Sequence, residues 1–150
     1  MRLVTLCAVG AAFGLTAFAA ETKVKPSDLP AAVQAALKDQ TKGATIVGAS
    51  QEREHGHMTY EVETKRNGKG RDLTFAENGS LLEVEEEVDL NSIPAPAQEA
   101  IEKRAAGDTI SKVESVTRGS RTSYEADVKS KTGHNYEIAV NADGSAHPGN

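Results

Sequence analysis

Two segments of the chain carry apolar residues at intervals of three and four positions, which is the spacing of one helical face. The apolar positions are Leu29, Val33, Ala36 and Leu37 in the first segment, and Ile93, Ala97, Ala100 and Ile101 in the second. Pro30 and Pro94 suit a first helical turn, where a missing N–H costs little. Asp28 and Ser92 are the cap candidates. The pattern therefore predicts two helices, each ending near a glycine, Gly43 or Gly107.

After each helix the period changes to two, which is the period of a half-buried strand. The inward positions are Tyr60, Val62, Leu73 and Phe75 after the first helix, and Tyr124, Ala126, Val128, Tyr136, Ile138 and Val140 after the second. "NGKG" and "KTGH" separate these runs and predict hairpin turns. "TIVGASQE" and "TISKVESV" alternate imperfectly, so each predicts a first strand with a bulge.

The same order of turns and apolar positions occurs twice, since residues 28–61 align with residues 92–125 without a gap. This indicates an α+β fold built from a tandem duplicated unit, helix followed by three antiparallel strands. The first unit covers residues 28–89 and the second residues 90–150, with a disordered tail near 146–150. A unit of about 60 residues buries little core. We therefore expect one composite sheet with both helices on one face and a core that the units share, partly closed by Leu82 and Val84.

The N-terminus has one charge, Arg2, followed by an apolar run that ends in Ala17-Phe18-Ala19. This pattern predicts a signal peptide over residues 1–19, followed by a short linker over residues 20–27, and hence a periplasmic or secreted protein. Removal of this segment takes away Arg2 and Cys7, so the net charge changes from −5 to −6 and no thiol remains. An acidic chain of this kind is a poor partner for nucleic acid or for an anionic membrane.

The repeated segments resemble the PepSY-like, beta-lactamase-inhibitor-like family. The resemblance is carried by "LPAAVQAAL" and "TYEVETKRNGKGRDLTFAENGS" in the first unit, and by "IPAPAQEAI" and "SYEADVKSKTGHNYEIAVNADGS" in the second. It implies an exported, non-catalytic protein that binds and restrains a peptidase, and it brings no catalytic residues. The sequence agrees in lacking G-x-S-x-G and H-E-x-x-H, and no cofactor is expected.

Two histidines, His55 and His57, stand two residues apart in the first hairpin turn. Imidazole is a good ligand for copper, nickel or zinc, so this pair is a candidate metal site. The alternative is an ordinary polar turn, because no third ligand is placed by spacing. A small envelope protein that binds a metal or another ligand is accordingly the second functional hypothesis.

Carboxylates form the other candidate site. In "LLEVEEEVD" the alternation places Glu83, Glu85 and Glu87 on one face of a strand, where they could hold calcium or contact a basic partner. The alternative is a solvated face that protects a sheet edge. The outward positions of the two repeated hairpins, Glu61, Glu63, Glu125 and Asp127, are further partner-binding candidates. Cross-strand charge pairing alone would also explain them.

Overall fold

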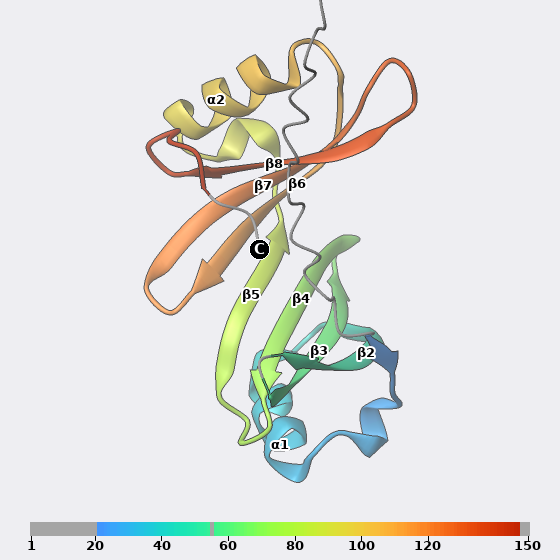
Figure 1. Ribbon diagram of the computed structural model, residues 1–150. Helices are drawn as coiled ribbons and strands as arrows, with labels where there is room; N and C mark the ends of the chain where they lie inside the picture. Colours follow the sequence, from blue (N-terminus) through green and yellow to red (C-terminus); the bar gives the residue numbers. More distant parts are fainter. Residues whose placement is uncertain (1–20, 55, 148–150) are drawn as a thin grey trace, which may run out of the picture.

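The computed structural model describes residues 21–54 and 56–147. In this part of the chain, eight strands form one open antiparallel sheet in the order of the sequence, and two α-helices pack against it (Figure 1). The α+β class and the composite sheet predicted from the sequence are confirmed. The predicted signal peptide, residues 1–19, lies outside the described residues.

The element order is helix and then strands in both halves of the chain. The first half contains β1 (Thr22–Lys23), a 3-10 turn (Pro26–Asp28), α1 (Ala31–Gln40), β2 (Thr45–Glu54), β3 (His57–Arg66), β4 (Lys69–Ala76) and β5 (Leu81–Glu87). The second half contains a 3-10 turn (Leu90–Ser92), α2 (Ala95–Ala105), β6 (Thr109–Arg118), β7 (Arg121–Lys129) and β8 (Asn135–Asn141). The bulges expected in the first strand of each half lie between Ile46 and Gly48 and between Ile110 and Lys112.

The helix starts differ from the prediction. Pro30 and Pro94 are themselves the N-cap residues, with extended ψ angles of 144° and 136°, and no side chain caps either helix. Asp28 and Ser92 instead end the preceding 3-10 turns. A cap side chain needs to sit next to the first helical N–H groups, and here the rigid proline holds that place.

Both helices cover the same face of the sheet, as predicted. The cross-strand register aligns Val62 with Leu73 and Val84, which lie on the face that α1 covers. On β6 the same face carries Val113, which is paired with Ala126 of β7 and lies under α2. The buried side chains of this face form two clusters. One joins α1 to β2–β4 (Leu29, Val33, Leu37, Ala49, Tyr60, Val62, Leu73, Phe75), and the other joins α2 to β6–β8 (Ile93, Ala97, Ile101, Ala105, Val113, Ala126, Val128, Ile138, Val140).

A single core shared by the two halves is therefore a wrong prediction. Val84 packs on the first cluster and Val88 on the second, whereas Leu82 is 43% exposed. A register shift between Thr74 and Phe75 turns Leu82 away from the core. Between the clusters, Glu86 forms an ion pair with Arg71 at 2.7 Å, so a polar contact separates the two cores.

Three smaller features of the structure bear on what the sequence suggested. The linker over residues 20–27 contains β1 and a 3-10 turn, and β1 pairs with Ser50 and Gln51 of β2. The C-terminal tail is attached to the sheet as far as His147, whose backbone N–H donates to the carbonyl of Ala139 at 3.2 Å. The acidic strand β5 does not protect an edge, because it pairs with β4 on one side and β6 on the other.

The turn after β8 packs closely against α2, and a substitution of the glycine in that turn tests this contact. Gly144 has φ +81°, and a Cβ there would lie 2.5 Å from the carbonyl oxygen of Pro96 in α2. Gly144→Ala should lower the free energy of unfolding by about 2–4 kcal/mol, from backbone strain and overpacking together. Gly68→Ala is the matched control, since the φ of Gly68 is +85° but no atom of the described residues lies within 4 Å of a Cβ placed there. That change should cost only about 1 kcal/mol of backbone strain in denaturant unfolding, and equal losses would contradict the close approach.

Candidate functional site

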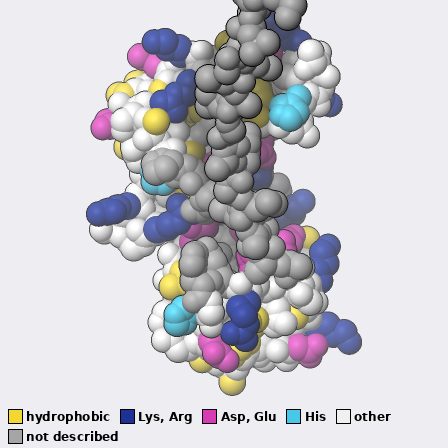
Figure 2. All heavy atoms as spheres, viewed as in Figure 1, with side chains coloured by type: hydrophobic (Ala, Val, Ile, Leu, Met, Phe, Trp, Pro, Cys, Tyr) yellow, Lys and Arg dark blue, Asp and Glu magenta, His cyan; other side chains and the backbone are white. Residues whose placement is uncertain are grey.

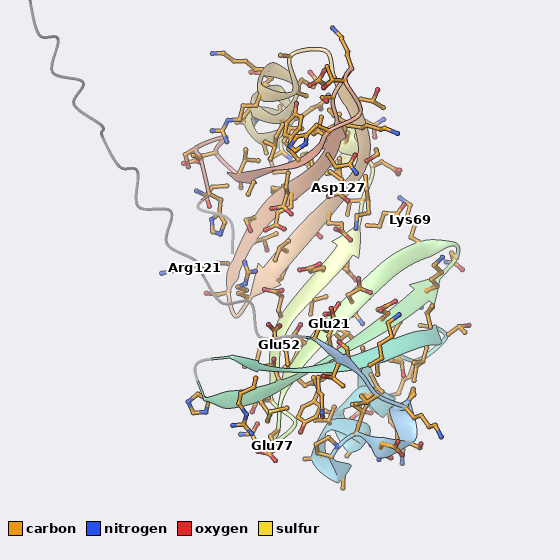
Figure 3. The ribbon with its side chains drawn as sticks, turned by 45° about the vertical axis from the view of Figure 1, so that its right-hand side comes forward. Glu21, Glu52, Lys69, Glu77, Arg121 and Asp127 are labelled. Atoms are coloured by element: carbon orange, nitrogen blue, oxygen red, sulfur yellow. The ribbon has the colours of Figure 1, made fainter. Side chains whose placement is uncertain are left out.

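The sheet face opposite the helices is the candidate site. The described residues place no helix on it, and its central positions carry carboxylates from six successive strands. These are Glu61 and Glu63 of β3, Asp72 of β4, Glu83, Glu85 and Glu87 of β5, Glu114 of β6, Glu125 and Asp127 of β7, and Glu137 of β8. We call this surface the open face. Acidic side chains are visible in the waist between the two halves in Figure 2, and Figure 3 labels Glu21, Glu52 and Asp127 around it.

The register brings like charges directly opposite one another. Glu63 faces Asp72, and Asp72 faces Glu85. Across the next strands of the sheet, Glu87 of β5 faces Glu114 of β6, and Glu114 faces Glu125 of β7. Like charges at directly opposed positions destabilise a sheet. The arrangement of opposed carboxylates therefore lowers the stability of the sheet.

Three of these groups gather most closely. Single carboxylate oxygens of Asp72, Glu85 and Glu114 all lie within 4.8 Å of one another, and all three residues are half-buried. They come from three adjacent strands, β4, β5 and β6, so the group crosses the boundary between the two halves of the chain. Oxygen ligands in such a group suit a hard divalent cation.

Burial and crowding change the proton affinity of the open face. Burial raises the pKa of Glu85 to about 8, and a hydrogen bond with Glu83 and the charges of Glu83, Glu114 and Glu125 add to the rise. Burial raises the pKa of Glu61 to about 7, and the negative charges of Asp72 and other nearby carboxylates add to the rise. The pKa of Asp72 is also raised, by burial and then by Glu114 and Glu63. At neutral pH part of this acidic surface is therefore protonated.

Two cations lie among the central carboxylates. Lys112 Nζ is 2.8 Å from Glu114 Oε2 and 3.5 Å from Asp127 Oδ2. Arg118 forms an ion pair with Glu83 through its Nε, while its buried Nη2 has no hydrogen-bond partner among the described residues. The other basic residues on this side, Lys23, Lys65, Arg121 and Lys129, stand at strand ends. Negative charge thus predominates at the centre of the open face.

A hollow of about 490 Å³ lies on the open face where the halves meet. Its lining residues come from both halves, with Glu61, Glu83 and Glu85 on one side and Arg118 on the other. Leu82, which is 43% exposed, supplies an apolar part of the wall. A long cationic side chain with an aliphatic stem would match this combination of carboxylates and apolar surface.

The candidates selected from the sequence divide into two groups. The carboxylate candidates all lie on the open face: Glu61, Glu63, Glu83, Glu85, Glu87, Glu125 and Asp127. Of the two histidine candidates, the structure describes His57. His57 is exposed at the start of β3, and within residues 21–54 and 56–147 it is not part of a group of three potential metal ligands. His55 lies outside the described residues.

Sequence reasoning missed Asp72, Glu114 and Arg118. In "RDLTF" the alternation points Asp72 and Leu73 to opposite faces of the strand. The pattern was therefore sufficient to predict that Asp72 lies on the face away from the core. The irregular strand "TISKVESV" hid the side on which Glu114 lies, because a bulge reverses the alternation after Ile110. The pairing of β5 with β6, which brings Glu85 and Glu114 together, is a non-local contact that no local pattern contains.

Comparison with known proteins agrees with this architecture. The family model described as "Putative beta-lactamase-inhibitor-like, PepSY-like" matches residues 18–83 and, in a second overlapping match, residues 58–145. The two matches together cover most of the chain, and this protein belongs to the PepSY-like family. No curated protein matches the chain.

Several solved structures share the fold. A "BLIP-like protein" from Bacteroides fragilis has 19% identity and a TM-score of 0.58, with 79% of this chain and 84% of that chain covered. A protein from Bacteroides eggerthii, described as one of the "putative periplasmic proteins", has 18% identity and a TM-score of 0.64, with 79% and 85% covered. A DUF2874 family protein from Bacteroides uniformis has 19% identity and a TM-score of 0.63, with 78% and 85% covered. Among the described residues, neither helix has the length and apolar character needed to span a bilayer.

Proposed function

We propose that this protein is an exported, non-catalytic binding module whose open face docks a basic surface of another protein. The observation that carries the proposal is the gathering of carboxylates from β3 to β8 on the one sheet face that the described helices leave uncovered. Charge complementarity selects the occupant, because a cationic surface would relieve the repulsion between the opposed carboxylates.

The size of the open face supports a protein partner. The face extends across both halves of the sheet, and its carboxylates reach from Glu61 on β3 to Glu137 on β8. A small molecule would contact only part of such a surface, whereas protein interfaces commonly bury about 800 Å² on each side. The hollow beside Glu61 and Glu85 then receives a lysine or arginine side chain of the partner, and Leu82 contacts its stem.

The similarity of this chain to known proteins supports one class of partner. Membership of a family described as beta-lactamase-inhibitor-like, and the fold shared with a BLIP-like protein, support a restraining role toward an exported enzyme such as a peptidase. The neighbour described as periplasmic supports the same location for this chain. The repeated element order supports an origin of the two halves by duplication.

A divalent cation is the second candidate ligand, because Asp72, Glu85 and Glu114 bring their oxygens within 4.8 Å of one another. In this alternative the acidic strand is the ligand strand, with β4 and β6 completing the site. The histidine pair His55 and His57 is a separate metal hypothesis and remains a prediction.

Affinity capture and metal titration distinguish these functions. Residues 20–150, used as bait on an envelope fraction, should retain a protein with a basic surface, and about 0.5 M salt should release it, because salt screens exposed charge. Calorimetric titration with calcium or zinc should show no binding tighter than about millimolar, a range typical of weak sites. Micromolar binding lost on Glu85→Gln would instead favour the cation function, and micromolar binding lost on His57→Ala would favour the histidine site.

A further inference from the structure

β8 is the last strand of the described sheet, and its outer edge is largely unpaired (Figure 1). The carbonyl of Ala139 accepts a hydrogen bond on this side, from the backbone N–H of His147 at 3.2 Å. Main-chain groups of an antiparallel strand point to alternate sides, so Asn135 and Glu137 also direct their N–H and C=O groups outward. Both residues are exposed, and among the described residues these outward groups have no hydrogen-bond partner. We call residues 135–138 of this strand the β8 edge.

The first half of the sheet contains a strand in the corresponding position. β4 lies beside β3 as β8 lies beside β7, since Tyr60 is paired with Phe75 in one ladder and Tyr124 with Val140 in the other. The turns after β4 and β8 are closed by the same backbone hydrogen bond, with nitrogen–oxygen distances of 2.9 Å and 3.0 Å. The register of the two ladders therefore relates each residue of the β8 edge to a residue of β4.

The outer edge of β4 is occupied, whereas that of β8 is not. After its turn the chain returns along β4 as β5, which pairs with residues 71–75. After the turn that follows β8, the described chain forms a single bridge, between Val140 and Ala146. Residues 136–139 of β8 correspond to residues 71–74 of β4. Within the described chain they therefore lack the strand that β5 supplies to β4.

From this correspondence we propose that the β8 edge accepts an extended segment of another protein, which joins the sheet as a further strand antiparallel to β8. Addition of a strand to an exposed sheet edge is a recurring mode of peptide recognition, in which main-chain hydrogen bonds supply affinity and alternate side chains supply specificity. The inference concerns an edge of the sheet. It goes beyond the docking of the open face and does not depend on it.

β5 also indicates which side chains such a segment needs. On β5 the two faces alternate, with Val84 packed on the first cluster and Glu85 on the open face. At the corresponding places β8 presents Ile138, which is buried in the second cluster, and Glu137, which is exposed on the open face. The incoming segment should therefore place an apolar side chain opposite Ile138 and a lysine or arginine opposite Glu137.

Charge complementarity favours a basic segment over a second copy of this chain. Glu137 lies directly opposite Asp127 of β7, so negative charge already gathers beside the β8 edge. β8 of a second copy would bring the same carboxylates to this place, and like charges at opposed positions destabilise a sheet. A charged side chain at an edge commonly prevents self-association. Glu137 can fulfil that role and still attract a cationic strand.

An NMR titration of residues 20–150 with a short acetylated peptide of alternating valine and lysine tests the proposal. Because the edge is short, we expect a dissociation constant of about 0.1–1 mM. At a peptide concentration about ten times this constant, the Glu137 amide should exchange with deuterium about tenfold more slowly than in the free chain. The Ile138 amide points toward β7 and is the internal control, whose exchange should not change.

Two matched pairs of probes separate the main-chain contacts from the charge contact. A lysine opposite Glu137 directs its own N–H toward β8, and the neighbouring valines direct theirs away. Methylation of the lysine amides should therefore weaken binding at least about tenfold, whereas methylation of the valine amides should leave it within about twofold. Glu137→Lys should weaken binding of the lysine peptide about tenfold and should allow binding of the corresponding peptide of alternating valine and glutamate.

Several results would overturn the proposal. These are a dissociation constant weaker than about 10 mM, equal effects of methylation at lysine and at valine, and binding that leaves exchange of the Glu137 amide unchanged. Sedimentation of the unaltered chain as a dimer with this amide protected would show that a second copy occupies the edge. Protection of the same amide in a free monomer would show that the chain covers its own edge.

Discussion

Reversing three exposed carboxylates of the open face is expected to weaken capture of the partner by about 100-fold. The positions are Glu63 on β3, Asp127 on β7 and Glu137 on β8, each changed to lysine. A reversal replaces an attractive contact with a basic partner by a repulsive one, and a 100-fold loss needs only about 1 kcal/mol at each of three positions. The measurement is the dissociation constant of the captured protein from immobilised bait.

The matched control reverses the same amount of charge on the helices. Asp39 of α1 and Glu99 and Glu102 of α2 are exposed, and changing all three to lysine gives the same net charge as the open-face variant. Binding should then change by less than about threefold, because surface charges outside the interface act mainly through long-range attraction. Equal losses from both variants would show that net charge alone attracts the partner.

Phe75→Ala should lower the free energy of unfolding of the first half by about 3–5 kcal/mol. The Phe75 side chain is fully buried in the cluster that joins α1 to β2–β4, and its truncation leaves a cavity in that cluster. Leu82→Ala is the comparison, since this side chain is 43% exposed, and it should cost less than about 1 kcal/mol. Denaturant unfolding at constant pH measures both.

The location of the Phe75 effect also tests the two-core arrangement. Because the second cluster contains no residue of α1 or β2–β4, the amides of α2 and β7 should keep most of their protection from hydrogen exchange in Phe75→Ala. Equal loss of protection in both halves would show that they unfold as one unit. That cooperative behaviour is what the sequence favours, on the ground that each half alone has too small a core.

Local patterns predicted the elements and their buried faces well. The period of two placed Val62, Leu73 and Val128 inward, and all are buried. Tyr60 is also buried, while Tyr124 and Tyr136 are only half-buried. The hydroxyl of Tyr136 extends to Asp108 Oδ2 at 3.0 Å, a contact that alternation cannot reveal. Side-chain direction was therefore predictable from the pattern, whereas depth of burial depended on packing.

The site was predictable only in part, for a physical reason. Alternation identified which carboxylates point away from the core, and it placed Glu83 and Glu85 correctly. It could not show that these groups meet Asp72 and Glu114, because strand pairing and register are non-local properties. The alternative of an acidic strand that protects a sheet edge fails for the same reason, because the non-local pairing of β5 with β6 makes β5 the strand that joins the halves.

The docking role of the open face can be tested most directly by photo-cross-linking in an envelope fraction. Benzoylphenylalanine at Glu63 or Asp127 samples the open face of each half, and the same probe at Ala35 of α1 or Glu99 of α2 samples the helix side. All four positions are exposed, so the probe should not disturb either core. We expect one and the same protein to be cross-linked from Glu63 and from Asp127, and not from Ala35 or Glu99. Cross-links from the helix positions without any from the open face would contradict the account.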